Sequence, residues 1–244
     1  MRITIEGAPA LECVESDYED SDKTSFLYHV SRHFGTVQVH GAAQLLAVKY
    51  LQQRQDELGI KSVVEFFGGV GIGTAIIQKV LQPESHTVYE IDDVCINHLK
   101  NQAFADRITV EMRDAKEAML DSTADLMYLD FFSFSAYRLK DWRRQLDAVF
   151  FSEPTAVEIT DTSIARLPLQ KERYAKALGR NFDGREDYAM AFSDKITREY
   201  GYKLAYYAYR ENACMVFLPK DKVVAPTEFR RLNQTDGDMS VQRW

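Results

Sequence analysis

The sequence lacks the features that several protein classes require. Nowhere in its 244 residues do roughly 18 apolar residues run together, so no membrane-spanning helix is expected. The first residues, Met1 to Gly7, lack the basic-then-apolar profile of a signal peptide. The three cysteines, Cys13, Cys95 and Cys214, stand far apart without a Cys-x-x-Cys pair, which disfavours both a zinc site and a disulfide framework. These absences predict a cytoplasmic, reduced protein that binds no metal.

Positive charge is also in short supply. Lys and Arg number 30 against 37 Asp and Glu, which gives a net charge of −7 and disfavours a broad, non-specific grip on nucleic acid. The charge is unevenly placed, however. Six carboxylates fall between Glu12 and Asp22, whereas basic clusters follow residue 137. The overall sign therefore does not settle the partner.

From residue 61 onward, short β-like runs alternate with helical patterns, which predicts an α/β fold with a doubly wound, mostly parallel sheet. The expected strands are 61–67, 87–91, 108–112, 124–131, 155–160, 203–210 and 214–219. The expected helices are 74–81, 92–103, a short one from 116, 137–151 and a long region over 169–200. Only three residues, 211–213, join the last two strands, so these must form an antiparallel hairpin.

The chain divides into three expected segments. Residues 1–60 form an N-terminal extension, a strand or hairpin plus a helix over 42–57, that packs on the core or covers it as a lid. Residues 61–222 form the main α/β domain, and residues 223–244 form a C-terminal tail.

The most informative segment is the turn that follows the first strand of the main domain. An apolar run containing Glu65 leads into Gly68, Gly69, Gly71 and Gly73, four of only 12 glycines in the chain. Glycines let the backbone approach a ligand closely and adopt φ values that other residues avoid. Such a turn, opening a helix in an open α/β sheet, indicates a site for an adenosine-containing ligand at the helix N-terminus.

Acidic residues follow the next three expected strands. Glu90 and Asp92 end the second strand, where dinucleotide-binding folds use a carboxylate to accept ribose hydroxyls. Asp92 equally suits the N-cap of the next helix. Asp114 follows the third strand, where a turn-forming role is an alternative, and Asp130 ends the fourth.

Together these motifs resemble those of the class I S-adenosylmethionine-dependent methyltransferases, over roughly residues 61–220. That family has a seven-stranded sheet whose last strand is inserted antiparallel by a hairpin. The resemblance implies S-adenosyl-L-methionine as cofactor, with Glu65 meeting its ammonium, Glu90 its ribose and Asp114 its adenine amino group. The residues it assigns to the cofactor are Glu65, Phe67, Gly68, Gly69, Gly71, Glu90, Ile91, Asp114, Ala115 and Asp130.

The fourth motif, Asp130-Phe131-Phe132-Ser133, stands where amino-methylating nucleic-acid enzymes carry Asp-Pro-Pro-Tyr. The resemblance implies that Asp130 accepts a hydrogen bond from the target amine and that an aromatic side chain stacks on the base. Asp130, Phe131 and Phe132 are therefore the candidate catalytic residues. Both prolines of the family motif are missing here, which leaves the activity of this motif open. Glu158 and His40 are more distant candidates for the proton acceptor.

Several rival activities lack their residues. The turn has Thr74 in place of the third glycine of the dinucleotide fingerprint, and no lysine follows as in a P-loop. No Tyr-x-x-x-Lys pair exists for a dehydrogenase of that class. Cytosine-C5 methyl transfer needs a cysteine nucleophile after the fourth strand, where Asp130 stands instead. Phe132 and Ser133 cannot supply the extra metal-binding carboxylate of the catechol-type enzymes.

Direct methyl transfer to a nitrogen or oxygen remains, and the acceptor class stays open. A nucleic-acid base amino group is slightly favoured by the Asp130 motif and by two groups of basic residues. These are Arg138, Lys140, Arg143 and Arg144, and then Lys171, Arg173, Lys176, Arg180 and Arg185. A small-molecule acceptor is favoured by the net acidity and by the lack of a recognisable target-binding domain. A non-catalytic, cofactor-binding scaffold of a methyltransferase complex is a third interpretation.

Overall fold

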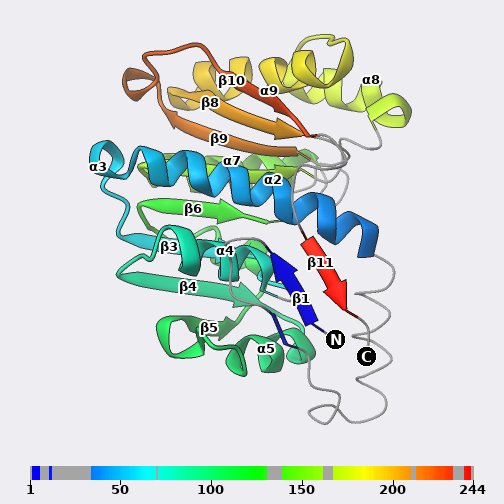
Figure 1. Ribbon diagram of the computed structural model, residues 1–244. Helices are drawn as coiled ribbons and strands as arrows, with labels where there is room; N and C mark the ends of the chain where they lie inside the picture. The colour runs from blue at the N-terminus through cyan, green and yellow to red at the C-terminus, as the bar shows by residue number, and fades with distance from the viewer. Residues whose placement is uncertain are drawn as a thin grey trace.

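A single eight-stranded sheet forms the centre of the computed structural model, which describes residues 2–5, 11–12, 34–69, 71–130, 139–161, 167–209, 213–232 and 239–242. Its strands lie in the order β10-β8-β9-β7-β6-β3-β4-β5, and Figure 1 labels all of them except β7. Their bounds are β3 (Ser62–Phe66), β4 (Ser85–Glu90), β5 (Thr109–Met112), β6 (Leu126–Leu129), β7 (Ala156–Asp161), β8 (Tyr202–Tyr209), β9 (Ala213–Pro219) and β10 (Glu228–Arg231). All neighbouring pairs are parallel except those of β9, which is antiparallel to both β7 and β8.

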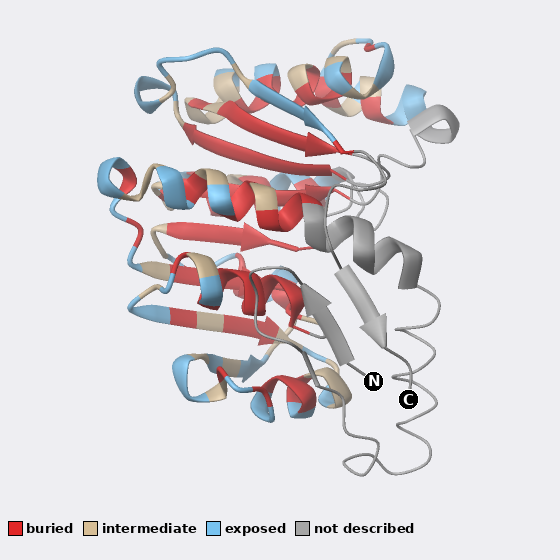
Figure 2. Cartoon of the chain, in the orientation of Figure 1, coloured by how far each residue is buried: buried red, intermediate tan, exposed pale blue. Residues whose placement is uncertain are grey.

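Helices cover both faces of this sheet. The first face carries α2 (Phe34–Gln53), α3 (Gln55–Leu58), α4 (Ile72–Val80) and α5 (Asp93–Lys100). The second carries α6 (Ala115–Ala118), α7 (Leu139–Phe151), α8 (Leu167–Leu178) and α9 (Gly184–Tyr200). In the part of the chain that the structure describes, short 3-10 turns lie at Ala105–Arg107 and Lys220–Lys222. Two hydrophobic clusters, one on each face, therefore sandwich the sheet, and the central strands are buried throughout (Figure 2).

Particular residues fix where these helices begin and end. Asp92 caps α5 by accepting hydrogen bonds from the backbone of Val94 (2.9 Å) and Cys95 (3.2 Å). Gly201, at φ 77°, ends α9 in the left-handed conformation that favours glycine. Because β3 to β7 pair in parallel, the helices between them run back across the sheet, and the carboxyl ends of these strands lie together at one edge.

The expected fold class is confirmed, with the hairpin of β8 and β9 in place, but the strand count was wrong. The sheet has eight strands instead of seven, because β10 pairs in parallel with β8, Glu228 opposite Tyr206. The long helical region is likewise two helices, α8 and α9. The break follows Gly179, whose φ of 76° cannot continue an α-helix.

A second, three-stranded sheet joins the two ends of the chain. The strand β1 (Arg2–Ile5) pairs antiparallel with β2 (Leu11–Glu12) and with β11 (Met239–Gln242). Figure 1 shows β1 and β11 side by side near α2. None of the helices in the described residues is long and apolar enough to cross a membrane.

Candidate functional site

The glycine turn leads from β3 into α4 and packs tightly against β4 and α5. A Cβ atom on Gly68 would lie 2.3 Å from Val88 Cγ1, and one on Gly71 would lie 2.7 Å from Leu99 Cδ2. Gly69, at φ 51°, differs from both, because a Cβ there would meet no atom of the described residues closer than the Phe67 carbonyl oxygen at 3.8 Å. Gly68 and Gly71 therefore serve close packing, whereas the described residues leave the backbone at Gly69 open to a ligand.

Phe67 adopts φ 64°, a left-handed conformation that is uncommon for a bulky residue. Its half-buried side chain packs against the hydrophobic cluster on the α7–α9 face of the sheet. A strained backbone held in place by its surroundings is frequent at ligand-binding turns. Phe67 thus starts the change of direction that the glycines complete.

Glu90, at the end of β4, holds this turn through its carboxylate. Its Oε2 accepts from the Gly69 N–H (2.7 Å), and its Oε1 accepts from the N–H groups of Ile91 (2.7 Å) and Asp92 (3.0 Å). A carboxylate offers about four acceptor positions, so Glu90 retains room for one more donor. The structure thereby brings together two of the predicted cofactor motifs, the glycine turn and the end of β4.

Apolar side chains lie exposed beside this carboxylate. Ile91 is 60% exposed, and Met112, whose neighbour across the β4–β5 pair is Glu90, is 65% exposed. Asp114 follows Met112 and caps α6 by accepting from the Lys116 N–H at 2.8 Å. Exposed apolar groups next to hydrogen-bonding carboxylates suit a flat, partly polar ring such as adenine. Ala115, by contrast, is buried in the core.

Asp130 directly follows β6, next to the start of the glycine turn. Its backbone N–H donates to the Phe66 carbonyl (3.2 Å), which ties the end of β6 to the end of β3, and its side chain is only 6% exposed. The predicted catalytic partners Phe131 and Phe132 lie outside the described residues. His40 lies in α2, but its side chain is not among those described.

Glu65 lies fully buried under the first turn of α4. Its Oε2 accepts from the Thr74 hydroxyl (2.7 Å) and lies 3.1 Å from His86 Nε2, and Gln78 supports the other ring nitrogen of His86 at 3.0 Å. The second oxygen, Oε1, has no hydrogen-bond partner among the described groups. The described partners of the Glu65 carboxylate are Thr74 and His86. Contact between Glu65 and a cofactor ammonium stays a prediction.

A row of buried polar side chains continues from Glu65 across the sheet. Tyr128 lies opposite Glu65, and Glu158 lies opposite Tyr128, so the three side chains share one face. The Thr160 hydroxyl donates to Glu158 at 3.1 Å. Burial raises the pKa of Glu158 well above its usual range, and the charge of Asp130 raises it further. Glu158 consequently favours its protonated form.

Sequence reasoning missed the roles of Tyr128 and His86 in this row. Tyr128 lies in the apolar strand β6 and His86 in the mixed strand β4, and the sequence around neither residue shows a partner for it. Strand register alone would have placed Tyr128 between Glu65 and Glu158. In the described ranges, no three His, Cys, Asp or Glu side chains gather in a way that could hold a metal ion.

The two basic groups that suggested nucleic acid differ in the structure. Lys140, Arg143 and Arg144 are exposed on the first turns of α7, the helix that follows the Asp130 segment. Lys171 instead pairs with Asp183 (3.1 Å), and Arg180 pairs with Asp187 and Asp194 (2.9 and 3.3 Å). Arg138 lies outside the described residues. Ion pairs thus occupy two members of the second group, whereas the three described members of the α7 group are exposed near the carboxyl edge.

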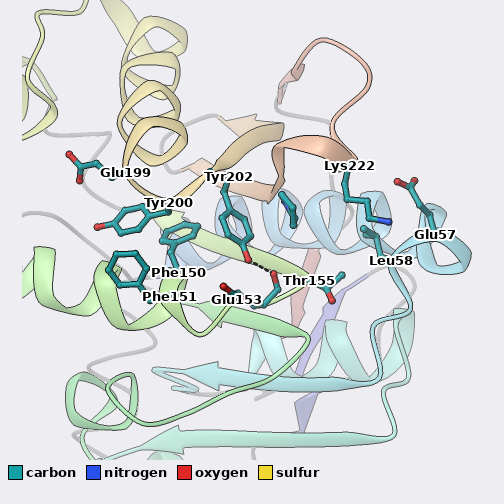
Figure 3. Close-up of a pocket in the computed structure, with 13 residues that line it drawn as sticks. Glu57, Leu58, Phe150, Phe151, Glu153, Thr155, Glu199, Tyr200, Tyr202 and Lys222 are labelled. Atoms are coloured by element: carbon teal, nitrogen blue, oxygen red, sulfur yellow. Dashed lines mark hydrogen bonds between the residues drawn. The ribbon is translucent and has the colours of Figure 1, made fainter.

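A cavity of about 670 Å³ opens at the opposite, amino-terminal edge of the sheet (Figure 3). Its walls include Tyr200 and Phe151, which is 66% exposed, and Tyr202, whose hydroxyl donates to the Pro154 carbonyl at 2.6 Å. None of the predicted cofactor residues lines it. The cavity is thus separate from the candidate site at the carboxyl edge.

No protein-family model matches the sequence, and no curated protein matches it. Similar solved structures exist, however. They include Trm1 from Pyrococcus horikoshii in complex with S-adenosyl-L-methionine, at TM-score 0.62 and 12% identity over 91% of this chain and 64% of that one. The mitomycin 7-O-methyltransferase MmcR matches at TM-score 0.51 and 17% identity, over 83% of this chain and 59% of that one.

The plantazolicin methyltransferase BamL, in complex with a triazolic desmethylPZN analogue and SAH, matches at TM-score 0.50 and 13% identity, over 75% of this chain and 74% of that one. This chain spans less than two thirds of the length of Trm1 and MmcR. The order of the strands and the similarity to these solved structures indicate the same fold. The chain has the fold of the class I S-adenosylmethionine-dependent methyltransferases.

Proposed function

We propose that this protein is an S-adenosylmethionine-dependent methyltransferase that transfers a methyl group directly to a nitrogen or oxygen of its acceptor. The observation that carries the proposal is the bond between Glu90 and Gly69, which couples the glycine turn to the end of β4. Trm1 and BamL were both solved with S-adenosylmethionine or its product, which supports the same cofactor here.

The residues present fit this cofactor. Gly69 offers open backbone for its methionine part, Glu90 has one remaining acceptor position for a ribose hydroxyl, and exposed Ile91 suits the adenine ring. Because only one position on Glu90 is free, accepting both ribose hydroxyls requires one backbone bond of Glu90 to open. Asp114 is the proposed acceptor for the adenine amino group.

S-Adenosylmethionine supplies an activated methyl group on a sulfonium. The protein then has to place the acceptor, since orientation and proximity can provide most of the rate enhancement. Asp130 is the proposed residue for this task. Its carboxylate would accept a hydrogen bond from the N–H or O–H of the acceptor and take up the proton that the methylated product loses.

A nucleic-acid base amino group is the acceptor we favour. The exposed Lys140, Arg143 and Arg144 support it, because α7 begins at the same edge of the sheet at which Asp130 lies. The ion pairs of Lys171 and Arg180 withdraw support from the second basic group. A small-molecule acceptor is the alternative, and the net charge of −7 favours it. A non-catalytic scaffold is the second alternative.

Two experiments separate these possibilities. In the first, methyl-labelled cofactor is incubated with total RNA, with DNA and with a small-molecule extract, and the labelled fraction identifies the acceptor class. Asp130→Ala should keep cofactor binding and lose turnover. Retained turnover in Asp130→Ala would remove its assigned role, and transfer to no fraction would favour the scaffold.

The second experiment measures nucleic-acid affinity by gel shift over a salt series. The triple variant Lys140→Gln, Arg143→Gln, Arg144→Gln should weaken binding and flatten the salt dependence, since each phosphate contact contributes about one unit of slope. A matched triple variant at the opposite edge changes the same charge at Lys79, Lys100 and Lys220. Equal losses in both variants, or no binding at low salt, would argue for a small-molecule acceptor.

A further inference from the structure

The cavity at the amino-terminal edge of the sheet has aromatic walls. Phe150 stacks on Tyr200 with the ring centroids 5.0 Å apart. Phe151 meets the Tyr200 ring edge-on at 5.3 Å, and Tyr202 meets the Phe150 ring edge-on at 5.1 Å. The volume of about 670 Å³ lies within the range of small-molecule binding sites. The cavity can therefore hold the apolar body of a small molecule against these rings.

Neither tyrosine of this wall has a proton left to donate to a ligand. The Tyr200 hydroxyl donates to Asp147 Oδ1 at 2.7 Å, and the Tyr202 hydroxyl donates to the Pro154 carbonyl at 2.6 Å. A hydroxyl has a single proton, so both are used within the protein. The faces of aromatic rings carry negative partial charge. The aromatic wall therefore favours a positively charged group over a negatively charged one.

Glu153 adds a carboxylate beside this wall. The other two carboxylates that line the cavity, Glu57 and Glu199, each pair with a nearby arginine or lysine, at 2.8 and 2.6 Å. Among the described residues, no lysine or arginine pairs with Glu153. Burial raises the pKa of Tyr202 to about 12, and the charge of Glu153 contributes to this rise, so the carboxylate lies near the Tyr202 ring (Figure 3). Glu153 can thus accept a hydrogen bond from a cation that rests on the aromatic wall.

The cation that lines the cavity lies at its other end. Figure 3 shows Lys222 next to Glu57, away from Phe151 and Tyr200. Its ammonium therefore does not occupy the space between Glu153 and the exposed ring of Phe151. The aromatic end keeps a carboxylate without a described partner.

We propose that this cavity binds a small organic cation, an amine carried on an aromatic or other apolar body. The ammonium contacts the Glu153 carboxylate, and the apolar body packs on Phe151 and Tyr200. Contact between the cation and a ring face adds to the attraction of the carboxylate. The inference does not depend on the proposed function, because the cavity lies at the edge of the sheet opposite the candidate site.

Three probes of equal shape and different charge test the proposal. Phenethylamine, 2-phenylethanol and 3-phenylpropionate share a phenyl ring on a two-carbon chain and are positive, neutral and negative at neutral pH. Saturation-transfer NMR titrations of the full chain measure the Kd of each probe. Phenethylamine should bind most tightly and 3-phenylpropionate least. Added salt should weaken the binding of phenethylamine but not that of the alcohol, since salt screens the charge of Glu153.

Variants of the cavity locate the binding. Glu153→Gln removes the charge and Phe151→Ala removes the exposed ring, and each should weaken the binding of phenethylamine by about three- to fivefold. Glu153→Gly should do the same without loss of stability, because Glu153 has φ 56° after the end of α7, a conformation that favours glycine. The matched control is Gln82→Gly, at φ 49° after the end of α4, which should bind phenethylamine like the wild type.

Several results would overturn the inference. These are binding of none of the three probes, equal binding of all three, and tightest binding of 3-phenylpropionate. Undiminished binding of phenethylamine in Glu153→Gln and Glu153→Gly, or an equal loss in Gln82→Gly, would overturn it as well. None of these results bears on the proposed methyl transfer, which the cofactor and acceptor experiments test separately.

Discussion

Glu90 should carry both the stability of the glycine turn and the response to the cofactor. Its carboxylate accepts three backbone N–H groups, from Gly69, Ile91 and Asp92, at 2.7 to 3.0 Å. Glu90→Ala removes all three bonds, whereas Glu90→Gln keeps one oxygen acceptor and places an amide N–H₂ against at least one backbone donor. The two variants therefore separate the loss of the turn from the loss of the charge.

The magnitudes follow from these bonds. Glu90 is half-buried, so freed amides regain water, and each bond contributes about 1 kcal/mol to the free energy of unfolding. Glu90→Ala should lose roughly 3 kcal/mol, which corresponds to a fall in Tm of roughly 6–12 °C for a chain of this size. Glu90→Gln should lose about a third of this. Cofactor at about 100 times its Kd should stabilise the wild type by about 2.7 kcal/mol and neither variant.

Thermal unfolding with and without millimolar S-adenosylmethionine measures both effects, and Glu111→Gln serves as the control that keeps the wild-type response. A full cofactor response in Glu90→Gln would refute the role given to the carboxylate. A Glu90→Ala variant as stable as the wild type would refute the role of the three backbone bonds. If S-adenosylmethionine does not change the melting curve of the wild type, the assignment of this cofactor is wrong.

Three further outcomes test the surroundings of the site. Gly73→Ala should lower the Tm by several degrees, because its Cβ would lie 2.7 Å from Glu65 Oε1. Gly69→Ala should lower the free energy of unfolding by only about 1 kcal/mol, through backbone strain. Equal losses in the two variants would contradict the packing described. Burial raises the pKa of Glu158, so at pH values above the usual carboxyl range the folded state binds more protons than the unfolded state. The free energy of unfolding of the wild type should therefore fall as the pH rises. In urea unfolding, the stability of Glu158→Gln relative to the wild type should increase with pH. Burial lowers the pKa of His98 from 6.5 to about 4, so between these pH values the unfolded state binds more protons than the folded state. The free energy of unfolding should therefore fall by up to about 3 kcal/mol as the pH drops through this window. His98→Gln should not show this pH dependence.

Features written into adjacent residues were predictable from the sequence. The glycine turn, the Asp92 cap and the β8–β9 hairpin each depend on a short segment. In each, the residue types of that segment are enough to predict the local backbone conformation. The edge at which Glu90, Asp114 and Asp130 gather was predictable as well, because the carboxyl ends of parallel strands share one edge.

Features that depend on distant partners were not. All four residues of β10 are exposed, so no buried alternation marks it, and its place comes from backbone pairing with β8. Glu65 gave no sign that it would be buried, since its partner His86 lies 21 residues away along the chain. Phe67 stands at a position that requires φ above zero, which a sequence pattern assigns to glycine.

The antiparallel pairing of β1 with β11 sets Arg2 opposite Gln242, so the first and last described strands form a hairpin without a connecting turn. Paired residues in such a ladder lie only about 5 Å apart. A linker of a few glycines would therefore join the two strands into a continuous loop, and the chain could be reopened elsewhere, for instance at the exposed Gly179 between α8 and α9. This circular rearrangement would move new ends to the α8–α9 break while keeping the order of all the central strands. A fusion next to β1 or β11 would have to leave this ladder free to close.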